Sequence, residues 1–100
     1  MNTESITILL LEDDLAFAEA LRELLPAAVH RATDLRHVTR LSEARAALES
    51  TRFDVILLDL NVPDSAGKRT FSRVLPQAGG TPVIVLTSID DEALAVQAGR

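Results

Sequence analysis

The chain has 100 residues, of which 47% are hydrophobic and 25% are charged, and its formal net charge is −5 at pH 7. This balance predicts one soluble globular domain and excludes a disordered segment or a membrane-spanning chain. The absence of cysteine excludes a disulfide scaffold, a thiol nucleophile and sulfur-bound zinc. The acidic balance and the scattered arginines argue against direct nucleic-acid binding. No secretory signal is visible, so we expect a cytoplasmic domain that does not enter a membrane.

The first predicted strand, Ile6 to Leu11, is a continuous apolar run that leads directly into an acidic turn. The residues of that turn are Glu12, Asp13 and Asp14. A helix is expected from Leu15 to Leu25, with Asp14 as its N-cap and Pro26 at its far end. Its apolar residues recur at helical spacing and are Phe17, Leu21, Leu24 and Leu25.

The rest of the chain repeats the same alternation of strand and helix. Further strands are predicted at Asp34–Val38, Val55–Leu58 and Val83–Leu86. Further helices are predicted at Ser42–Glu49, at Lys68–Leu75 with Phe71, Val74 and Leu75 inward, and from about Asp90 onward. Strand and helix repeated four times with short connections predict an α/β fold, a doubly wound parallel sheet with right-handed crossovers.

Carboxylates follow the first and third predicted strands. Asp59 alone is equally well explained as a turn former or a cap for the next helix. However, strands one and three are neighbours in a doubly wound sheet, so Glu12, Asp13 and Asp59 should meet at one edge. Like charges at close range are unfavourable unless a cation offsets them or some stay protonated. Mg²⁺ is the expected cofactor, because it accepts a few carboxylates and keeps several waters.

A metal ion beside a free carboxylate indicates phosphoryl transfer to that carboxylate, here Asp59. Thr87 ends the fourth predicted strand on the same side, and its hydroxyl could donate a hydrogen bond to a phosphate oxygen. Thr87 can also be explained as a β-branched strand terminus. For Ser88, followed three residues later by Asp91, we prefer the simpler interpretation as a helix-capping pair.

Three segments, ILLLEDD, VILLDLNVPDSAG and PVIVLTS, resemble the signatures of bacterial response-regulator receiver domains, in the family's order and spacing. The resemblance extends from Ile6 to Gly99. It implies a flavodoxin-like receiver fold with strand order 2-1-3-4 in this chain, with the family's fifth strand, fifth helix and strand-5 lysine missing. Residues 1–100 are therefore expected to form one receiver domain that is incomplete at its C-terminus.

The resemblance also implies a role for each site residue. Asp59 would be the phosphoacceptor, with phosphate supplied by a sensor histidine kinase or a histidine phosphotransfer protein. Asp13 would bind Mg²⁺ directly, Glu12 through water, and Asn61 through its backbone carbonyl. Thr87 would contact the phosphate and couple its arrival to a loop movement. Such a domain catalyses its own phosphorylation and dephosphorylation and is not a turnover enzyme.

Two alternative functions remain open, because some of the family's site residues are present and one is missing. The acidic pair, Asp59 and Thr87 favour a phosphorylated receiver. The missing lysine favours a pseudo-receiver or an interaction module that is not phosphorylated. Loss of the fifth strand would also leave Val83–Leu86 as an apolar sheet edge, which predicts a homodimer or swapped assembly across it.

Overall fold

The computed structural model describes residues 5–86, and every structural statement below concerns that part of the chain. Thr87, Ser88 and the helix predicted from about Asp90 lie outside it. Strands and helices alternate throughout. They are β1 (Ile6–Leu11), α1 (Leu15–Val29), β2 (Thr33–Val38), α2 (Leu41–Ser50), β3 (Val55–Asp59), α3 (Lys68–Ala78) and β4 (Val83–Leu86).

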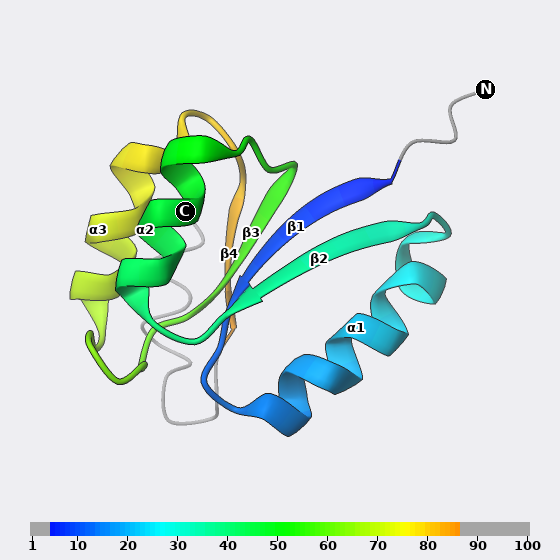
Figure 1. Cartoon of the computed structure of the whole chain (residues 1–100), viewed down its shortest axis with the longest axis horizontal. Coiled ribbons are helices and arrows are strands. Elements are labelled where there is room, and N and C mark those ends of the chain that lie inside the picture. Colours follow the sequence, from blue (N-terminus) through cyan, green and yellow to red (C-terminus); the bar gives the residue numbers. More distant parts are fainter. Residues whose placement is uncertain (1–4, 87–100) are drawn as a thin grey trace.

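The four strands form one parallel sheet in the order β2-β1-β3-β4. This is the predicted order, and the α/β doubly wound fold is confirmed. Figure 1 shows helix α1 on one face of the sheet and helices α2 and α3 on the other. Because all the strands run the same way, the residues that follow β1 and β3 lie at one edge of the sheet.

The central strands are buried on both faces, which explains their continuous apolar sequences. Along β1, Leu9 and Leu11 pack into the core beneath α2 and α3, whereas Ile8 and Leu10 pack into the core beneath α1. In β3, Ile56 and Leu58 join the first core and Leu57 joins the second. The sheet therefore holds the ends of β1 and β3 between two cores.

Helix α1 is longer than predicted, because it continues through Pro26 to Val29. A proline lacks the N–H that would bond back along the helix, but its carbonyl still accepts. Here the N–H groups of His30 and Arg31 both donate to the carbonyl oxygen of Pro26, and His30 ends the helix in a left-handed conformation. The predicted inward face was wrong in part, since Leu24 is 64% exposed and Phe17 is also exposed.

Helix α3 also continues past its predicted end at Leu75, through Pro76 to Ala78. Leu75 was predicted to point inward but is 49% exposed. The buried residues of α3 are Thr70, Val74 and Ala78. These three residues are spaced four apart and so lie on one face of the helix, which differs in part from the face predicted from the apolar residues.

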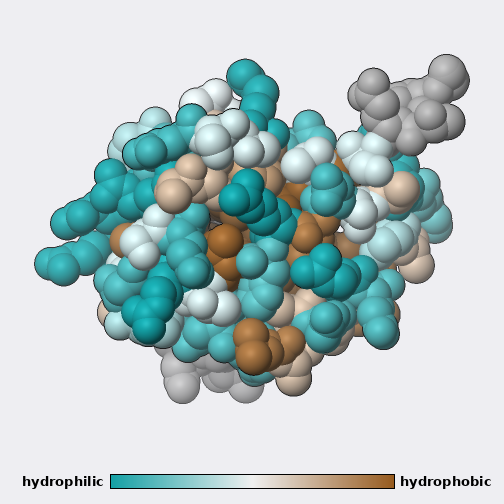
Figure 2. All heavy atoms as spheres, in the orientation of Figure 1, coloured by the Kyte–Doolittle hydropathy of each residue, from teal (hydrophilic) through white to brown (hydrophobic). Residues whose placement is uncertain are grey.

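The molecular surface is mainly hydrophilic. Figure 2 shows hydrophobic residues in the middle of the face in view, where Figure 1 shows the strands between the two helical layers. No helix among residues 5–86 is long and apolar enough to cross a membrane. Among these residues β4 pairs only with β3, and its Ile84 is 50% exposed. The dimer across β4 stays a prediction, which sedimentation at several concentrations would test.

Candidate functional site

Strand register brings the two acidic segments together. Leu11, the last residue of β1, lies opposite Leu58 in β3. The next residue on each chain segment is acidic, Glu12 after β1 and Asp59 at the end of β3. Two carboxylates that are distant in the sequence therefore lie side by side at the carboxyl edge of the sheet, where parallel α/β sheets bind ligands.

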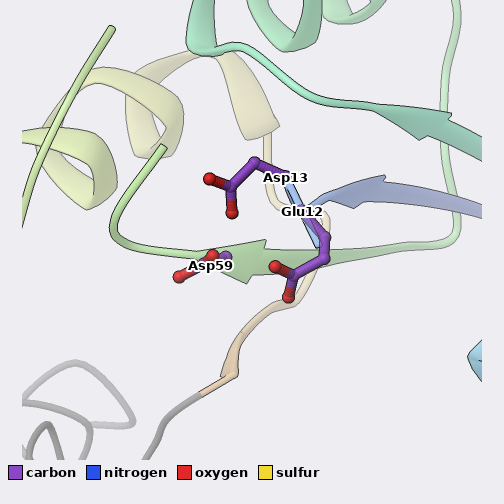
Figure 3. A group of neighbouring side chains, drawn as sticks. All are labelled: Glu12, Asp13 and Asp59. Atoms are coloured by element: carbon purple, nitrogen blue, oxygen red, sulfur yellow. The ribbon is translucent and has the colours of Figure 1, made fainter. Parts of the chain in front are cut away.

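The acid cluster consists of Glu12, Asp13 and Asp59. One carboxylate oxygen from each residue lies within 4.8 Å of the others. Figure 3 shows the three side chains around a common space at the ends of β1 and β3. Glu12 is buried, Asp59 is half-buried and Asp13 is exposed, so the cluster opens to solvent on one side.

The acid cluster perturbs the ionisation of two of its members. The pKa of the Glu12 carboxyl is raised to about 7, mainly by burial. The hydrogen bond from the Asp14 backbone N–H lowers this pKa, whereas a hydrogen bond with Asp59 and the charges of Asp59 and Asp13 raise it further. Burial also raises the pKa of Asp59, against the lowering effect of the Asn61 backbone N–H and of Glu12. Without a cation, Glu12 therefore keeps its proton up to a higher pH than an ordinary glutamate does.

The chemistry of the cluster fits a hard divalent cation. It offers three carboxylates and no nitrogen or sulfur ligand. Mg²⁺ binds oxygen ligands and keeps several waters, which suits a cluster that is open on one side. A cation would also offset the repulsion from Asp59 and Asp13, which adds to the effect of burial on the pKa of Glu12. The acid cluster is thus able to hold a metal ion of this class.

Several contacts hold the segment that carries Glu12 and Asp13. The Glu12 side chain accepts a hydrogen bond from the Asp14 backbone N–H at 3.1 Å. Asp14 in turn caps α1, accepting from the Phe17 N–H at 3.1 Å, as predicted from the sequence. The ring of His37 in β2 lies 2.7 Å, through Nε2, from the backbone oxygen of Glu12. Sequence reasoning missed this last contact.

The loop after β3 is closed by its own hydrogen bonds. The Asn61 backbone N–H donates to Asp59 Oδ1 at 3.0 Å, and the Gly67 N–H donates to Asn61 Oδ1 at 3.2 Å. Gly67 has a φ of 62°, a conformation that favours glycine. Val62 and Ser65 pair through both of their backbone groups. The Asn61 side chain is therefore engaged within the loop.

A buried pair of hydroxyls supports the residue after Asp59. Thr70 Oγ1 donates to the Leu60 backbone oxygen at 2.6 Å and lies 2.7 Å from Ser65 Oγ. Thr70 has no exposed surface. The sequence offered no signal for this contact, because a threonine within a helix is usually interpreted as a surface residue.

Comparison with protein families matches residues 8–100 to the response regulator receiver domain. The chain belongs to this family. The receiver domain is 35% identical over 85 residues to the swarming motility regulation protein RssB of Serratia marcescens, covering 85% of this chain and 37% of RssB. It is 31% identical over 97 residues to the transcriptional regulatory protein CiaR of Streptococcus pneumoniae, covering 94% of this chain and 42% of CiaR.

The receiver domain thus spans about two fifths of the length of these relatives.

Its fold also matches solved structures. The phosphorylated cyanobacterial phytochrome response regulator RcpA superposes with a TM-score of 0.77 at 30% identity, over 95% of this chain and 76% of RcpA. The MaeR response regulator bound to beryllium trifluoride superposes with a TM-score of 0.72 over 91% of this chain and 78% of MaeR; at 23% identity this match shows the fold alone.

The structure brings together Glu12, Asp13 and Asp59. It places Asn61 two residues beyond Asp59, in the closed loop. The predicted phosphate contact, Thr87, lies outside the described residues. One further carboxylate near this edge was not foreseen: Asp64, in the same loop, binds the start of α2.

Proposed function

We propose that this receiver domain accepts a phosphoryl group on Asp59 in a reaction that requires Mg²⁺. The observation that carries the proposal is the acid cluster, in which Glu12, Asp13 and Asp59 offer oxygen ligands within 4.8 Å of one another. Membership of the receiver family supports it. The donor would be a phosphohistidine on a sensor histidine kinase or a histidine phosphotransfer protein, and we place this exchange in the cytoplasm.

Each residue of the acid cluster has a separate role in metal binding in this proposal. Asp13 and Asp59 would bind the metal through their carboxylates, the backbone carbonyl of Asn61 would be a third ligand, and Glu12 would bind through water. When bound, Mg²⁺ would neutralise charge on the transferring phosphoryl oxygens. Glu12 would have to give up the proton that its raised pKa allows it to keep in the metal-free state.

Asp59 would act as the nucleophile. One carboxylate oxygen forms a bond to phosphorus while the bond from phosphorus to the donor's imidazole nitrogen breaks, and that nitrogen keeps the electron pair. The Asn61 N–H, at 3.0 Å from Oδ1, fixes the orientation of the carboxylate before transfer. This fixed orientation reduces the reorganisation that transfer needs. Thr87 would donate its hydroxyl to the new phosphate.

One solved structure supports the proposal. RcpA, which is 30% identical to this chain, has been obtained in a phosphorylated form. By similarity, we assign the phosphorylated residue of this chain to Asp59 and propose that phosphorylation changes its conformation. The domain would catalyse its own phosphorylation and dephosphorylation, as a signalling component without turnover of an external substrate.

The direct test is incubation with a small acyl phosphate, followed by intact mass measurement. With Mg²⁺ present, the native chain should gain the mass of one phosphoryl group, and chelation should abolish the gain. Asp59→Asn should gain nothing, whereas Asp54→Asn, which changes the residue just before the start of β3, should behave as the native chain does. An adduct that persists in Asp59→Asn, or the absence of one on the native chain, would favour an interaction module that is not phosphorylated.

A further inference from the structure

At the start of helix α2 the Glu43 side chain accepts from the backbone N–H of the N-cap residue, Arg40, but Arg40 itself offers the helix no side-chain acceptor. The Arg40 side chain carries only hydrogen-bond donors and cannot accept from the helix. The backbone N–H groups of Glu43 and Ala44 donate to the Arg40 carbonyl oxygen. The first two N–H groups, those of Leu41 and Ser42, need acceptors from elsewhere.

Asp64 supplies both acceptors from the loop that follows Asp59. Its Oδ1 lies 2.7 Å from the Leu41 backbone nitrogen, and its Oδ2 lies 3.0 Å from that of Ser42. A carboxylate is favourable at this end of a helix, where the helix dipole is positive. Slight burial raises the pKa of Asp64, but the hydrogen bonds from Ser42 and Leu41 outweigh it and leave the pKa below its usual value.

The loop that carries Asp64 is closed on itself. Asn61 Oδ1 accepts from the Gly67 N–H, and the backbones of Val62 and Ser65 bond to each other at 2.9 and 3.2 Å. This closure fixes Asp64 relative to Asn61, only three residues earlier. A displacement of Asp64 would therefore be transmitted to the backbone of Asn61.

We propose that Asp64 is a positioning residue that ties the metal-binding loop to the start of α2 and so couples Mg²⁺ binding to the order of that helix end. This inference rests on the Mg²⁺ site proposed above. Because coupling is reciprocal, Mg²⁺ should slow amide exchange at Leu41 and Ser42, and loss of the Asp64 contacts should weaken Mg²⁺ binding.

The experiment uses the 100-residue chain labelled with ¹⁵N. Magnesium chloride is titrated while amide chemical shifts give the dissociation constant, and amide exchange at Leu41 and Ser42 is measured with and without the metal. For the native chain we expect Mg²⁺ to slow exchange at these two amides. For Asp64→Ala we expect binding weaker by about tenfold, equivalent to about 1.4 kcal/mol, and amide exchange at both positions that no longer responds to Mg²⁺.

A matched control exists at the opposite end of the sheet. Asp54 Oδ2 accepts a hydrogen bond from the Thr7 backbone N–H at 2.8 Å, so it too joins a loop to a distant segment. Asp54→Ala should leave the Mg²⁺ dissociation constant and the exchange at Leu41 and Ser42 unchanged. Urea titration of both variants shows whether each remains folded under the conditions of the metal titration.

Two further variants separate position from charge. Asp64→Asn keeps one oxygen acceptor and loses the charge, whereas Asp64→Glu keeps the charge and moves it by one methylene. If Asp64 acts by position, the asparagine variant binds Mg²⁺ more tightly than the glutamate variant. If it acts only by attracting the cation, the order reverses and the difference shrinks as salt is added.

The outcomes distinguish the two proposals. If the native chain shows no Mg²⁺-dependent shifts near Glu12, Asp13 and Asp59, the proposed metal site is wrong. If the native chain binds Mg²⁺ but Asp64→Ala binds it equally well, or if Asp54→Ala weakens binding as much, the metal site stands and the role of Asp64 is wrong.

Discussion

The Nε2 atom of His37, at the end of β2, lies 2.7 Å from the backbone oxygen of Glu12. A carbonyl can only accept, so the imidazole donates and Nε2 carries the hydrogen. The Glu12 N–H, for its part, donates to the Val38 carbonyl oxygen at 3.0 Å. Strand β2 therefore holds the peptide groups on both sides of Glu12, although β2 contributes no member of the acid cluster.

Replacing His37 should loosen the acidic turn. His37→Phe keeps a ring of similar shape but removes the donor, and the free energy of unfolding should fall by about 1 kcal/mol. Mg²⁺ binding should weaken as well, because Glu12 is less firmly held. His37→Gln keeps an N–H donor and should lose less unfolding free energy and less Mg²⁺ affinity. Urea denaturation measures the first quantity and metal titration the second. Equal losses in the two variants would show that the donor is unimportant.

The raised pKa of Glu12, about 7, predicts that Mg²⁺ binding depends on pH. The proton on Glu12 competes with the cation, so affinity should fall as pH is lowered from about 8 to about 6. A metal titration across this range measures the slope. In Glu12→Gln no such proton is present, and the slope should be much smaller. A steep slope in that variant would assign the proton to another residue.

The same group should affect stability in the absence of metal. Its ordinary pKa is 4.5, whereas in the folded protein it is about 7, so between these values the folded state holds a proton that the unfolded state has released. Stability then falls as pH rises through this window and is restored below it. Urea denaturation at several pH values, with a chelator, should show this fall in the free energy of unfolding.

Glu12→Gln provides the control for that stability measurement. The variant removes a charge that burial disfavours and that Asp13 and Asp59 also repel at neutral pH. In the metal-free state at about pH 8 it should therefore be more stable than the native chain by about 1 kcal/mol, allowing for solvent screening. Excess Mg²⁺ should reverse the order, because only the native residue retains its carboxylate. A glutamine variant that is less stable than the native chain without metal would show that the charge on Glu12 is not unfavourable in the folded state.

The buried hydroxyl of Thr70 offers a test of the loop's support. Thr70→Val keeps the shape but leaves the Leu60 carbonyl oxygen without this donor, which should cost about 1 to 3 kcal/mol of unfolding free energy. Thr81→Val is the matched control, since Thr81 Oγ1 bonds the Phe53 carbonyl oxygen at the other end of β3. Thr70→Val should weaken Mg²⁺ binding and Thr81→Val should not. Equal effects of the two variants on Mg²⁺ binding would mean that Thr70 supports the fold but not the site.

The order of the elements could be predicted from the sequence largely because the central strands, β1 and β3, are buried on both faces. Continuous apolar runs such as Ile8–Leu11 are typical of strands that are buried on both faces. The limits of the helices were less predictable. Pro26 was interpreted as marking a helix end, and the third helix was predicted to stop at Leu75. However, Pro26 and Pro76 each lie inside a helix near its C-terminus, where the lost N–H removes one hydrogen bond.

The acid cluster could also be predicted, because strand ends and sheet order together determine which carboxylates meet. The supporting contacts could not. Asp64 and Leu41 are 23 residues apart, and no local pattern joins a loop aspartate to a helix that begins with arginine as its N-cap. The contact of His37 with Glu12 likewise depends on the pairing of β2 with β1. Such contacts follow from the three-dimensional arrangement rather than from local sequence.

The central claim is that Asp59 is the group that receives phosphate within a Mg²⁺-dependent acid cluster. The most direct measurement is to treat the native chain with an acyl phosphate and Mg²⁺, trap the product by borohydride reduction and map the modified residue by peptide mass spectrometry. We predict a single modified position, Asp59, that disappears when Mg²⁺ is chelated. Modification at another residue, or at Asp59 to the same extent without the metal, would contradict the account.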